Sequence, residues 1–170
     1  FLENFLKFRE DVVLKKTKFD LNKAEDRAHI LIGLSVSVEN LDKVIKIIRG
    51  SKTPDDAKKS LLNTKWKINK SKKMISLIET KNSKGLYNLS VVQVEAILEL
   101  RLQKLTALER DDLFNNLKLL VDDINNYLKI LNSNKQLLKV LKDELAEIKD
   151  NFATPRKTEI QKHDIEDVDT

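Results

Sequence analysis

Residues 113–152 read LFNNLKLLVDDINNYLKILNSNKQLLKVLKDELAEIKDNF, and a seam position recurs there at alternating steps of four and three. This series, here called the return seam, has one clearly polar member and runs Leu113, Leu117, Leu120, Ile124, Tyr127, Leu131, Asn134, Leu138, Leu141, Leu145, Ile148, Phe152. Such spacing is typical of the a and d positions of a coiled coil. The stretch therefore predicts a helix of roughly 60 Å that packs on a partner helix.

A second series at helical spacing, here called the outgoing seam, lies near the start of the chain. It runs Leu14, Leu21, Ala24, Ala28, Leu31, Leu34, Val38, Leu41, Ile45, Ile48. A segment of different composition separates the two seams, which together predict an antiparallel coiled-coil hairpin with a tip between its arms. We expect Leu21, Ala24 and Ala28 to face the stretch 138–148 of the return arm.

Composition favours the same fold class. The chain is 41% hydrophobic and 35% charged, with three glycines and two prolines, which is too apolar for disorder and too poor in turn residues for a β-sandwich or barrel. We predict an all-α fold in which a small helical globular domain caps a long antiparallel coiled-coil hairpin. The expected parts are an outgoing helix over 1–50, a wholly helical cap over 51–106, a return helix over 107–160 and an acidic tail over 161–170.

Composition also argues against several functional classes. The chain has no cysteine, which excludes disulfides, thiolate catalysis and zinc sites built on Cys, and which is ordinary for a cytoplasmic protein. No apolar stretch approaches the roughly 20 residues needed to cross a bilayer. The sequence opens FLENFLKFRE, without an initiator Met or a signal-type block, as an excised fragment would. We expect a cytoplasmic location and no membrane partner.

Capping signals divide the tip and the return arm. Thr53-Pro54-Asp55-Asp56 predicts a helix start after the outgoing arm ends near Gly50. Ser90 with Gln93 predicts a capping box that opens a helix to about residue 104, and Thr106 with Glu109 predicts the start of the return arm. A further box, Ser133 with Gln136, coincides with the polar seam residue Asn134, so we expect a kink or break there.

The helix that begins after Ser90 has two apolar stripes. The broader one comprises Val91, Val94, Ile97, Leu98, Leu102 and Leu105, and the narrower one comprises Val92, Ala96 and Leu100. Two stripes imply two partners. Both could pack within the tip, or the narrower stripe could form a homodimer contact, because a small tip has little core to fill.

Candidates for catalysis, metal binding or base stacking are weak. Tyr127 lies on the return seam and Tyr87 precedes a helix cap among apolar neighbours, so packing roles are favoured for both. His29 and His163 are not part of any metal-ligand spacing. Trp66 is flanked by lysines, but a lone Trp in a helical tip is more often a core anchor than a stacking platform. We predict no catalytic residue, metal site or cofactor within this chain.

Charge leaves two further interpretations open. The formal charge is +5, with lysines grouped at 15–18 and 65–73 and acidic residues at the end of the chain. Such groups usually form solvated helix faces, but an arm that binds nucleic-acid phosphates would show them too. A generic coiled-coil scaffold would explain the periodicity equally well.

Short sequence blocks point further. FREDVV at 8–13, RAHIL at 27–31, LDKVI at 41–45, GLYNLS at 85–90, AILELRLQKLTALE at 96–109 and PRKTEI at 155–160 occur in this order. In order and spacing these blocks resemble the A subunits of DNA gyrase, and the related A subunits of topoisomerase IV share many of them. The last block departs from the family pattern, because Lys157 stands where a second arginine is usual.

The resemblance implies a structure and a role beyond what spacing predicts. In that family an antiparallel coiled coil ends in a small helical globule, and the globules of two subunits form an exit gate for a transported DNA duplex. The implied partners are a second copy through the cap and, in the holoenzyme, duplex DNA with the gyrase B subunit. The implied activity is ATP-dependent negative supercoiling, with ATP and Mg bound elsewhere in the enzyme. The equivalent segment of topoisomerase IV is the alternative.

Overall fold

The computed structural model describes residues 1–68, 75, 86–100 and 107–159, with no account of side chains at 107–110. In chain order the elements are α1 (Leu2–Glu39), α2 (Leu41–Gly50), α3 (Pro54–Asn63), β1 (Trp66–Lys67), β2 (Leu86–Tyr87), α5 (Val91–Glu99), α6 (Ala107–Asn132) and α7 (Asn134–Phe152). Helices dominate the described residues, which confirms the predicted all-α class.

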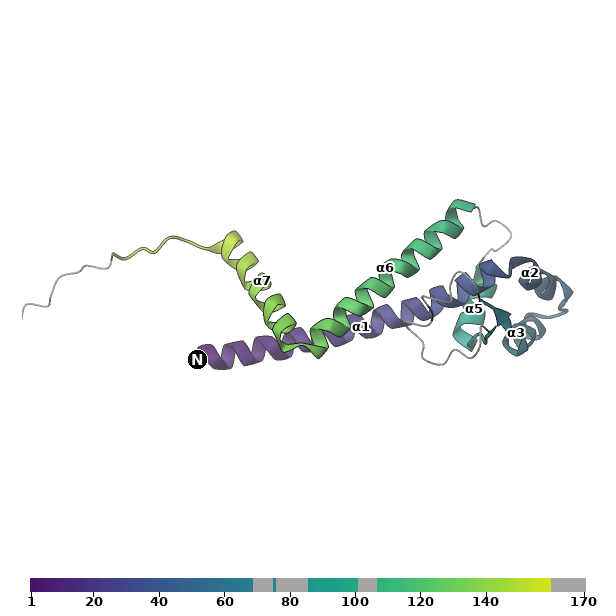
Figure 1. The fold of residues 1–170 in the computed structure, drawn as a ribbon, viewed down its shortest axis with the longest axis horizontal. Helices are drawn as coiled ribbons and strands as arrows, with labels where there is room; N and C mark the ends of the chain where they lie inside the picture. Colours follow the sequence, from purple (N-terminus) through teal and green to yellow (C-terminus); the bar gives the residue numbers. More distant parts are fainter. Residues whose placement is uncertain (69–74, 76–85, 101–106, 160–170) are drawn as a thin grey trace, which may run out of the picture.

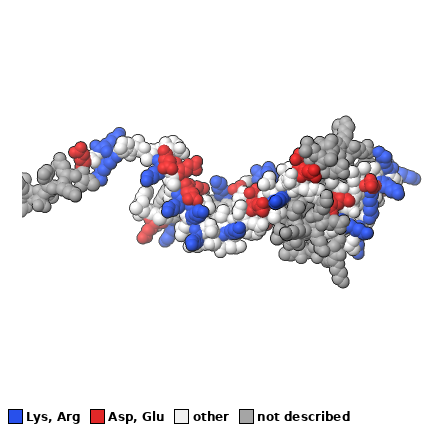
Figure 2. All heavy atoms as spheres, turned by 45° about the horizontal axis from the view of Figure 1, so that its top comes forward, with Lys and Arg blue, Asp and Glu red and all other residues white. Residues whose placement is uncertain are grey.

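Helix α1 forms one arm, and α6 followed by α7 forms the other (Figure 1). Residues early in α1 meet residues late in the return arm, since Arg9 Nη2 donates to Glu144 Oε2 over 2.7 Å. Further along α1, Leu31 lines the same pocket as Leu120 of α6. The two arms therefore run antiparallel. Charged side chains of both signs alternate along their surface (Figure 2).

The predicted break in the return arm is confirmed. Helix α6 ends at Asn132 and α7 begins at Asn134, because Ser133 has extended backbone with φ −137° and ψ 109°. The Ser133 carbonyl accepts hydrogen bonds from the backbone N–H groups of Gln136 and Leu137, each over 3.0 Å. The Ser133 side chain makes no cap, so the predicted capping box is not formed. Beyond this residue α7 runs at an angle to α6 (Figure 1).

This break changes which side chains of α7 face α1. Leu137 and Leu141 are buried against Val13, whereas Leu138 is 45% exposed and Ile148 is 51% exposed. Placing Leu138 and Ile148 on the return seam was therefore wrong. A heptad counted through Ser133 assumes an unbroken helix, and one extended residue rotates everything that follows. Leu145 is partly buried beside the same cluster.

The expected partner of the outgoing seam was also wrong. Leu21, Ala24 and Ala28 are buried in one apolar cluster with Leu117 and Ile124 of α6, and not with the stretch 138–148. Antiparallel helices with equal rise per residue pair outward from the point where the chain reverses. Ala28 lies about as far from the end of α1 as Leu117 lies from the start of α6. These equal distances explain why Ala28 lies beside Leu117 and not beside the stretch 138–148.

A second break, at Asn40, interrupts the outgoing arm that we expected to continue to residue 50. Asn40 has φ −120° and ψ 33° and separates α1 from α2. Its side-chain Nδ2 donates to the carbonyl oxygens of Val36, over 2.8 Å, and Lys67, over 2.9 Å. The second bond ties the end of α1 to strand β1, so Asn40 joins the arm to the cap.

The buried side chains of the cap come from four of its elements. Val44, Leu61, Trp66, Val94 and Ile97 are fully buried, and they come from α2, α3, β1 and α5. The Trp66 indole N–H donates to the Leu61 carbonyl over 3.2 Å, as suits a core anchor. The apolar cluster of the cap is continuous with the α1–α6 contact, so cap and arms share one core.

Strands β1 and β2 were not expected in a helical cap. They pair antiparallel, with Trp66 opposite Tyr87 and Lys67 opposite Leu86. Because successive side chains of a strand point to opposite faces, this pairing buries both aromatic residues and leaves Lys67 and Leu86 exposed. Two consecutive residues per strand are too short to give a periodic signal in the sequence.

The predicted helix starts in the cap are confirmed where the structure describes them. Thr53 Oγ1 accepts from the Asp56 N–H over 3.2 Å. Ser90 and Gln93 form both halves of their capping box, with distances of 3.2 and 2.9 Å. Helix α5 ends at Glu99, earlier than expected. The box that begins at Thr106, the side chains of Leu102 and Leu105, and the tail over 161–170 lie outside the described residues.

Candidate subunit contact on the cap

Gln93 anchors α5 to the arm and to β2. Gln93 stands between two valines, and its polar side chain is fully buried. The Oε1 atom accepts from the Ser90 backbone N–H over 2.9 Å. The Nε2 atom donates to the His29 carbonyl over 2.7 Å and to the Tyr87 hydroxyl over 2.8 Å. One amide therefore connects three elements of the fold.

The His29 imidazole closes this network. Its Nδ1 lies 3.4 Å from Gln93 Nε2, and its Nε2 lies 2.8 Å from Ser90 Oγ. The amide nitrogen of Gln93 has two hydrogens, which the His29 carbonyl and the Tyr87 hydroxyl accept, so its longer contact with Nδ1 is secondary. The network thus fixes α5 relative to α1 through the bond from Gln93 to the His29 carbonyl and the contact between the imidazole and Ser90.

Gly33 allows α1 and α5 to approach this closely. A Cβ atom at this position would lie 2.6 Å from both Cβ and Cγ of Gln93. Contacts of this length do not occur between carbon atoms that are not bonded, so any larger residue would push α5 away or displace Gln93. Gly33 is therefore required by packing rather than by backbone conformation.

Gln93 as a buried anchor and Gly33 as its contact were missed from the sequence. Gln93 was identified only as half of a capping box. Two signals could have revealed the pair, namely a polar residue inside the apolar run VVQVEAIL and a glycine on the buried face of a long helix. Neither signal specifies its partner, because the contact joins residues far apart in sequence.

The structure places the three residues of the narrower α5 stripe in different environments. Val92 is 53% exposed, whereas Ala96 and Leu100 are partly buried. Leu100 follows the last turn of α5, has ψ 127°, and packs against the main cluster. Val91, which we expected to face the core, is 48% exposed. The prediction for Val91 was wrong.

Three apolar side chains of the cap are exposed within a short stretch of sequence around the start of α5. Leu86 of β2 is exposed together with Val91 and Val92 from the first turn of α5. We call these three residues the cap patch. The Gln93 network holds the segment that carries Val91 and Val92 in place, so the patch belongs to a fixed surface. Large apolar side chains left exposed on a small domain are candidates for a protein contact.

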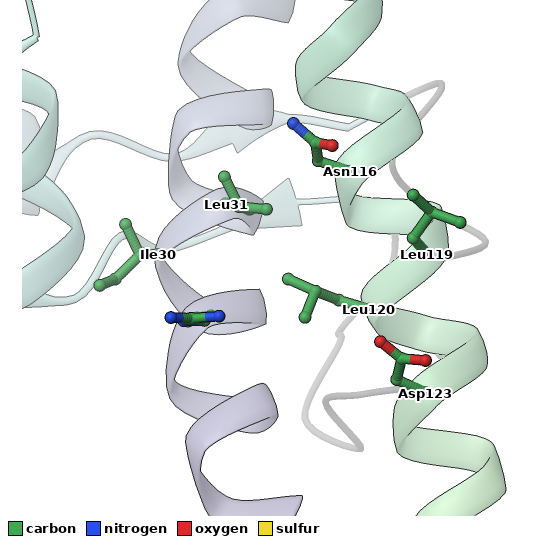
Figure 3. Close-up of a pocket in the computed structure, with 7 residues that line it drawn as sticks. Ile30, Leu31, Asn116, Leu119, Leu120 and Asp123 are labelled. Carbon is green, nitrogen blue, oxygen red and sulfur yellow. The ribbon is translucent and has the colours of Figure 1, made fainter. Parts of the chain in front are cut away.

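A pocket of about 430 Å³ lies between α1 and α6, below the cap. It is lined by Arg27, Ile30, Leu31, Asn116, Leu119, Leu120 and Asp123. In Figure 3, Leu31 and Leu120 extend toward one another from the two helices, and Leu119 lies on the outer side of α6. Both Leu31 and Leu120 are only partly buried, so the two seams do not close fully here.

Tyr127 has a neutral side chain over the physiological range. Partial burial raises the pKa of its phenol above the usual 10.0, and the nearby carboxylates of Asp123 and Asp20 raise it further. Within the described ranges, no three His, Asp or Glu residues are grouped as metal ligands would be. In the same ranges, no helix is both long and apolar enough to span a membrane.

Comparison with known proteins gives consistent matches. Residues 1–146 match the family of DNA gyrase and topoisomerase IV A subunits. The chain is 44% identical to the DNA gyrase A subunit of Rickettsia conorii over 171 residues, which cover 96% of this chain and 19% of that protein. The chain is 39% identical to the DNA gyrase A subunit of Granulibacter bethesdensis, and the match covers 94% of this chain and 17% of that protein. It is 38% identical to the DNA gyrase A subunit of Helicobacter pylori, and that match covers 99% of this chain and 18% of that protein. The chain thus spans less than a fifth of these curated relatives.

Proposed function

The chain belongs to the family of DNA gyrase and topoisomerase IV A subunits, and from that premise we propose that it is the exit-gate segment of a DNA gyrase A subunit. Two copies meet through their caps, and the contact opens to release a transported duplex during ATP-dependent negative supercoiling. The gyrase B subunit, ATP and Mg act in other parts of that enzyme. The relatives above are each named as the A subunit of DNA gyrase, which favours gyrase over topoisomerase IV.

The observation that carries this proposal is the cap patch at the closed end of two antiparallel arms. Leu86, Val91 and Val92 are exposed on a cap whose other large apolar residues, where the structure describes them, are buried or partly buried. A contact between two copies would cover them. Such a contact is isologous, apolar at its centre and modest in area, so it can part and close again.

The arms supply the geometry that a gate needs. They place the cap far from residue 1 and from the end of α7. The break at Asn40 separates α1 from the cap helix α2, and the break at Ser133 divides the return arm into two helical segments. Segments joined at single residues can rotate relative to one another about those residues. A swing of the arms would then separate or join two caps without unfolding either one.

Sedimentation equilibrium tests the contact. We expect the wild-type chain to dimerise, and Val92→Glu to shift it toward monomer, because the variant buries a charge against its symmetry mate at a cost of several kcal/mol if unpaired. Ala96→Glu should act in the same direction if the contact extends along α5. Circular dichroism should show unchanged helicity for Val92→Glu, since Val92 is half exposed.

Phe19→Glu is the matched control, because Phe19 is an exposed apolar residue on α1, at a distance from the cap. It should leave the dimer intact. A wild-type chain that stays monomeric at tens of micromolar would contradict the proposed contact, and so would equal dissociation of the Val92 and Phe19 variants.

A further inference from the structure

Positive charge is concentrated in the cap. Residues 41–106 contain fifteen Lys and Arg against six Asp and Glu, whereas the rest of the chain has more acidic than basic residues. Figure 2 shows Lys and Arg side chains gathered at the end of the molecule that α2 and α3 form. The +5 formal charge of the chain thus arises from the cap alone.

Eight of these cations lie in the described residues 41–67, and most of the eight have no described acidic partner. Lys58 pairs with Glu95 over 2.6 Å, and Lys43 lies 5.0 Å from the Trp66 ring centroid. The remaining described cations of 41–67 are exposed, and no described carboxylate lies within ion-pair distance of them: Lys46, Arg49, Lys52, Lys59, Lys65 and Lys67. We call these six residues the basic end.

The acidic residues of the same region offset only part of this charge, because residues 41–67 contain eight Lys and Arg against three Asp. Asp42 lies in the first turn of α2, and Asp55 and Asp56 lie in the first turn of α3. A helix N-terminus carries a partial positive charge, so carboxylates there interact first with their own helix. A shallow pocket of about 540 Å³ on α2 is lined by Asp42, Lys43, Ile45, Lys46 and Arg49. Three of its five lining residues are cations.

We propose that the basic end binds the phosphate backbone of duplex DNA. A duplex carries one negative charge per about 1.7 Å of its axis, and unpaired Lys and Arg side chains bind it by displacing condensed counterions. This contact does not depend on dimerisation of the cap. It assigns the end of the cap a direct interaction with DNA, separate from the apolar patch on α5.

Two observations favour duplex DNA over an anionic membrane surface or a single-stranded nucleic acid. No large apolar side chain is exposed in residues 41–67, whereas a membrane-surface helix inserts an apolar face into the lipid. Trp66, the aromatic residue of this region, is fully buried, so it cannot serve as the stacking platform that single-stranded nucleic acids use. A surface that is basic but neither apolar nor aromatic suits the backbone of a double helix.

Fluorescence anisotropy of a short labelled duplex, titrated with the 170-residue chain over a salt series, tests the proposal. The triple variant Lys46→Gln/Arg49→Gln/Lys52→Gln should weaken binding at least about tenfold at low salt. It should also reduce the slope of log affinity against log salt by about 2.7, from roughly 0.9 per lost phosphate contact. All three residues are exposed, so circular dichroism should match wild type.

The control variant Lys7→Gln/Lys18→Gln/Lys23→Gln removes the same charge from exposed positions on α1. It should leave affinity and slope nearly unchanged. Equal weakening of duplex binding by both variants would show that affinity depends on net charge alone, which would overturn the proposal. Absence of duplex binding would overturn it too, as would binding of phosphatidylserine vesicles, but not duplex, that depends on the basic end. If the triple variant loses helicity, the single variants Arg49→Gln and Lys23→Gln are compared instead. Arg49→Gln should reduce the slope of log affinity against log salt by about 0.9, and Lys23→Gln should leave it nearly unchanged.

Discussion

At the scale of single residues, the contact between Gly33 and Gln93 sets how the cap sits on the arm. The buried amide makes hydrogen bonds to α1, β2 and the start of its own helix, and its carbon atoms lie where a Cβ of residue 33 would be. A polar group buried this completely is stable only while all its partners remain in reach. The position of α5 therefore depends on the absence of a side chain at Gly33.

Gly33→Ala tests this sensitivity. The added methyl group should destabilise the chain by about 1–3 kcal/mol, because it overlaps Gln93 in a packed site. Gly50→Ala is the control, since a Cβ there meets no atom within 4 Å, and it should be neutral or stabilising by up to about 1 kcal/mol. Urea unfolding of both variants measures the difference. Equal effects at the two glycines would show that α5 does not pack on Gly33.

Tyr127 makes stability depend on pH in the alkaline range. Its folded-state pKa is raised, by burial first and then by Asp123 and Asp20, above the usual 10.0. Below pH 10.0 the phenol is neutral in both the folded and unfolded chain, and above it the unfolded chain ionises first. The free energy of unfolding should therefore fall as pH rises above that value. Tyr127→Phe should lose less stability than wild type between about pH 8 and 11, and parallel profiles would contradict the assignment.

At the scale of elements, the two arm breaks separate what the sequence predicted from what it did not. The break at Ser133 was predicted, because a capping residue and a polar seam position coincide there. The effect of this break on which α7 side chains are buried was not predicted, since a heptad pattern does not show that a helix rotates after a non-helical residue. Asn40 carries no comparable signal, because it interrupts the arm through a hydrogen bond to Lys67, distant in sequence.

In the cap, too, the sequence predicted only those features that depend on residues close together in the chain. Local signals predicted the starts of α3 and α5, because a cap is made by residues within one turn of each other. The β1–β2 pair and the bond from Gln93 to His29 join residues brought together by the tertiary fold. The stripe of Val92, Ala96 and Leu100 was a correct spacing on an ideal helix, but α5 ends before Leu100.

Paired substitutions in α7 test the shifted packing. Leu141 is 3% exposed and Leu138 is 45% exposed. Leu141→Ala should lower the free energy of unfolding by about 2–5 kcal/mol, and Leu138→Ala by less than about 1 kcal/mol. Chemical denaturation measures both. A larger loss at Leu138 would restore the uninterrupted heptad through Ser133 and contradict the packing described here.

At the scale of the whole molecule, the fold separates three surfaces. The arms are covered by interspersed charges of both signs (Figure 2). The cap patch is apolar, and the basic end carries cations without a described acidic partner. In the proposed gate, the patch holds two copies together and the basic end contacts DNA. The family match extends over both arms and the cap, so both surfaces lie in the part of the chain that the family shares.

The central claim is that two copies meet through their caps, and spin labels measure this directly. The chain has no cysteine, so Val92→Cys and Phe19→Cys each accept one label at a known position. Pulsed electron paramagnetic resonance on each labelled variant should give a short distance between the two labels at position 92. It should give a much longer distance at position 19, because the arms extend away from the contact. A shorter distance at position 19 than at position 92, or no dipolar coupling at either position, would contradict the claim.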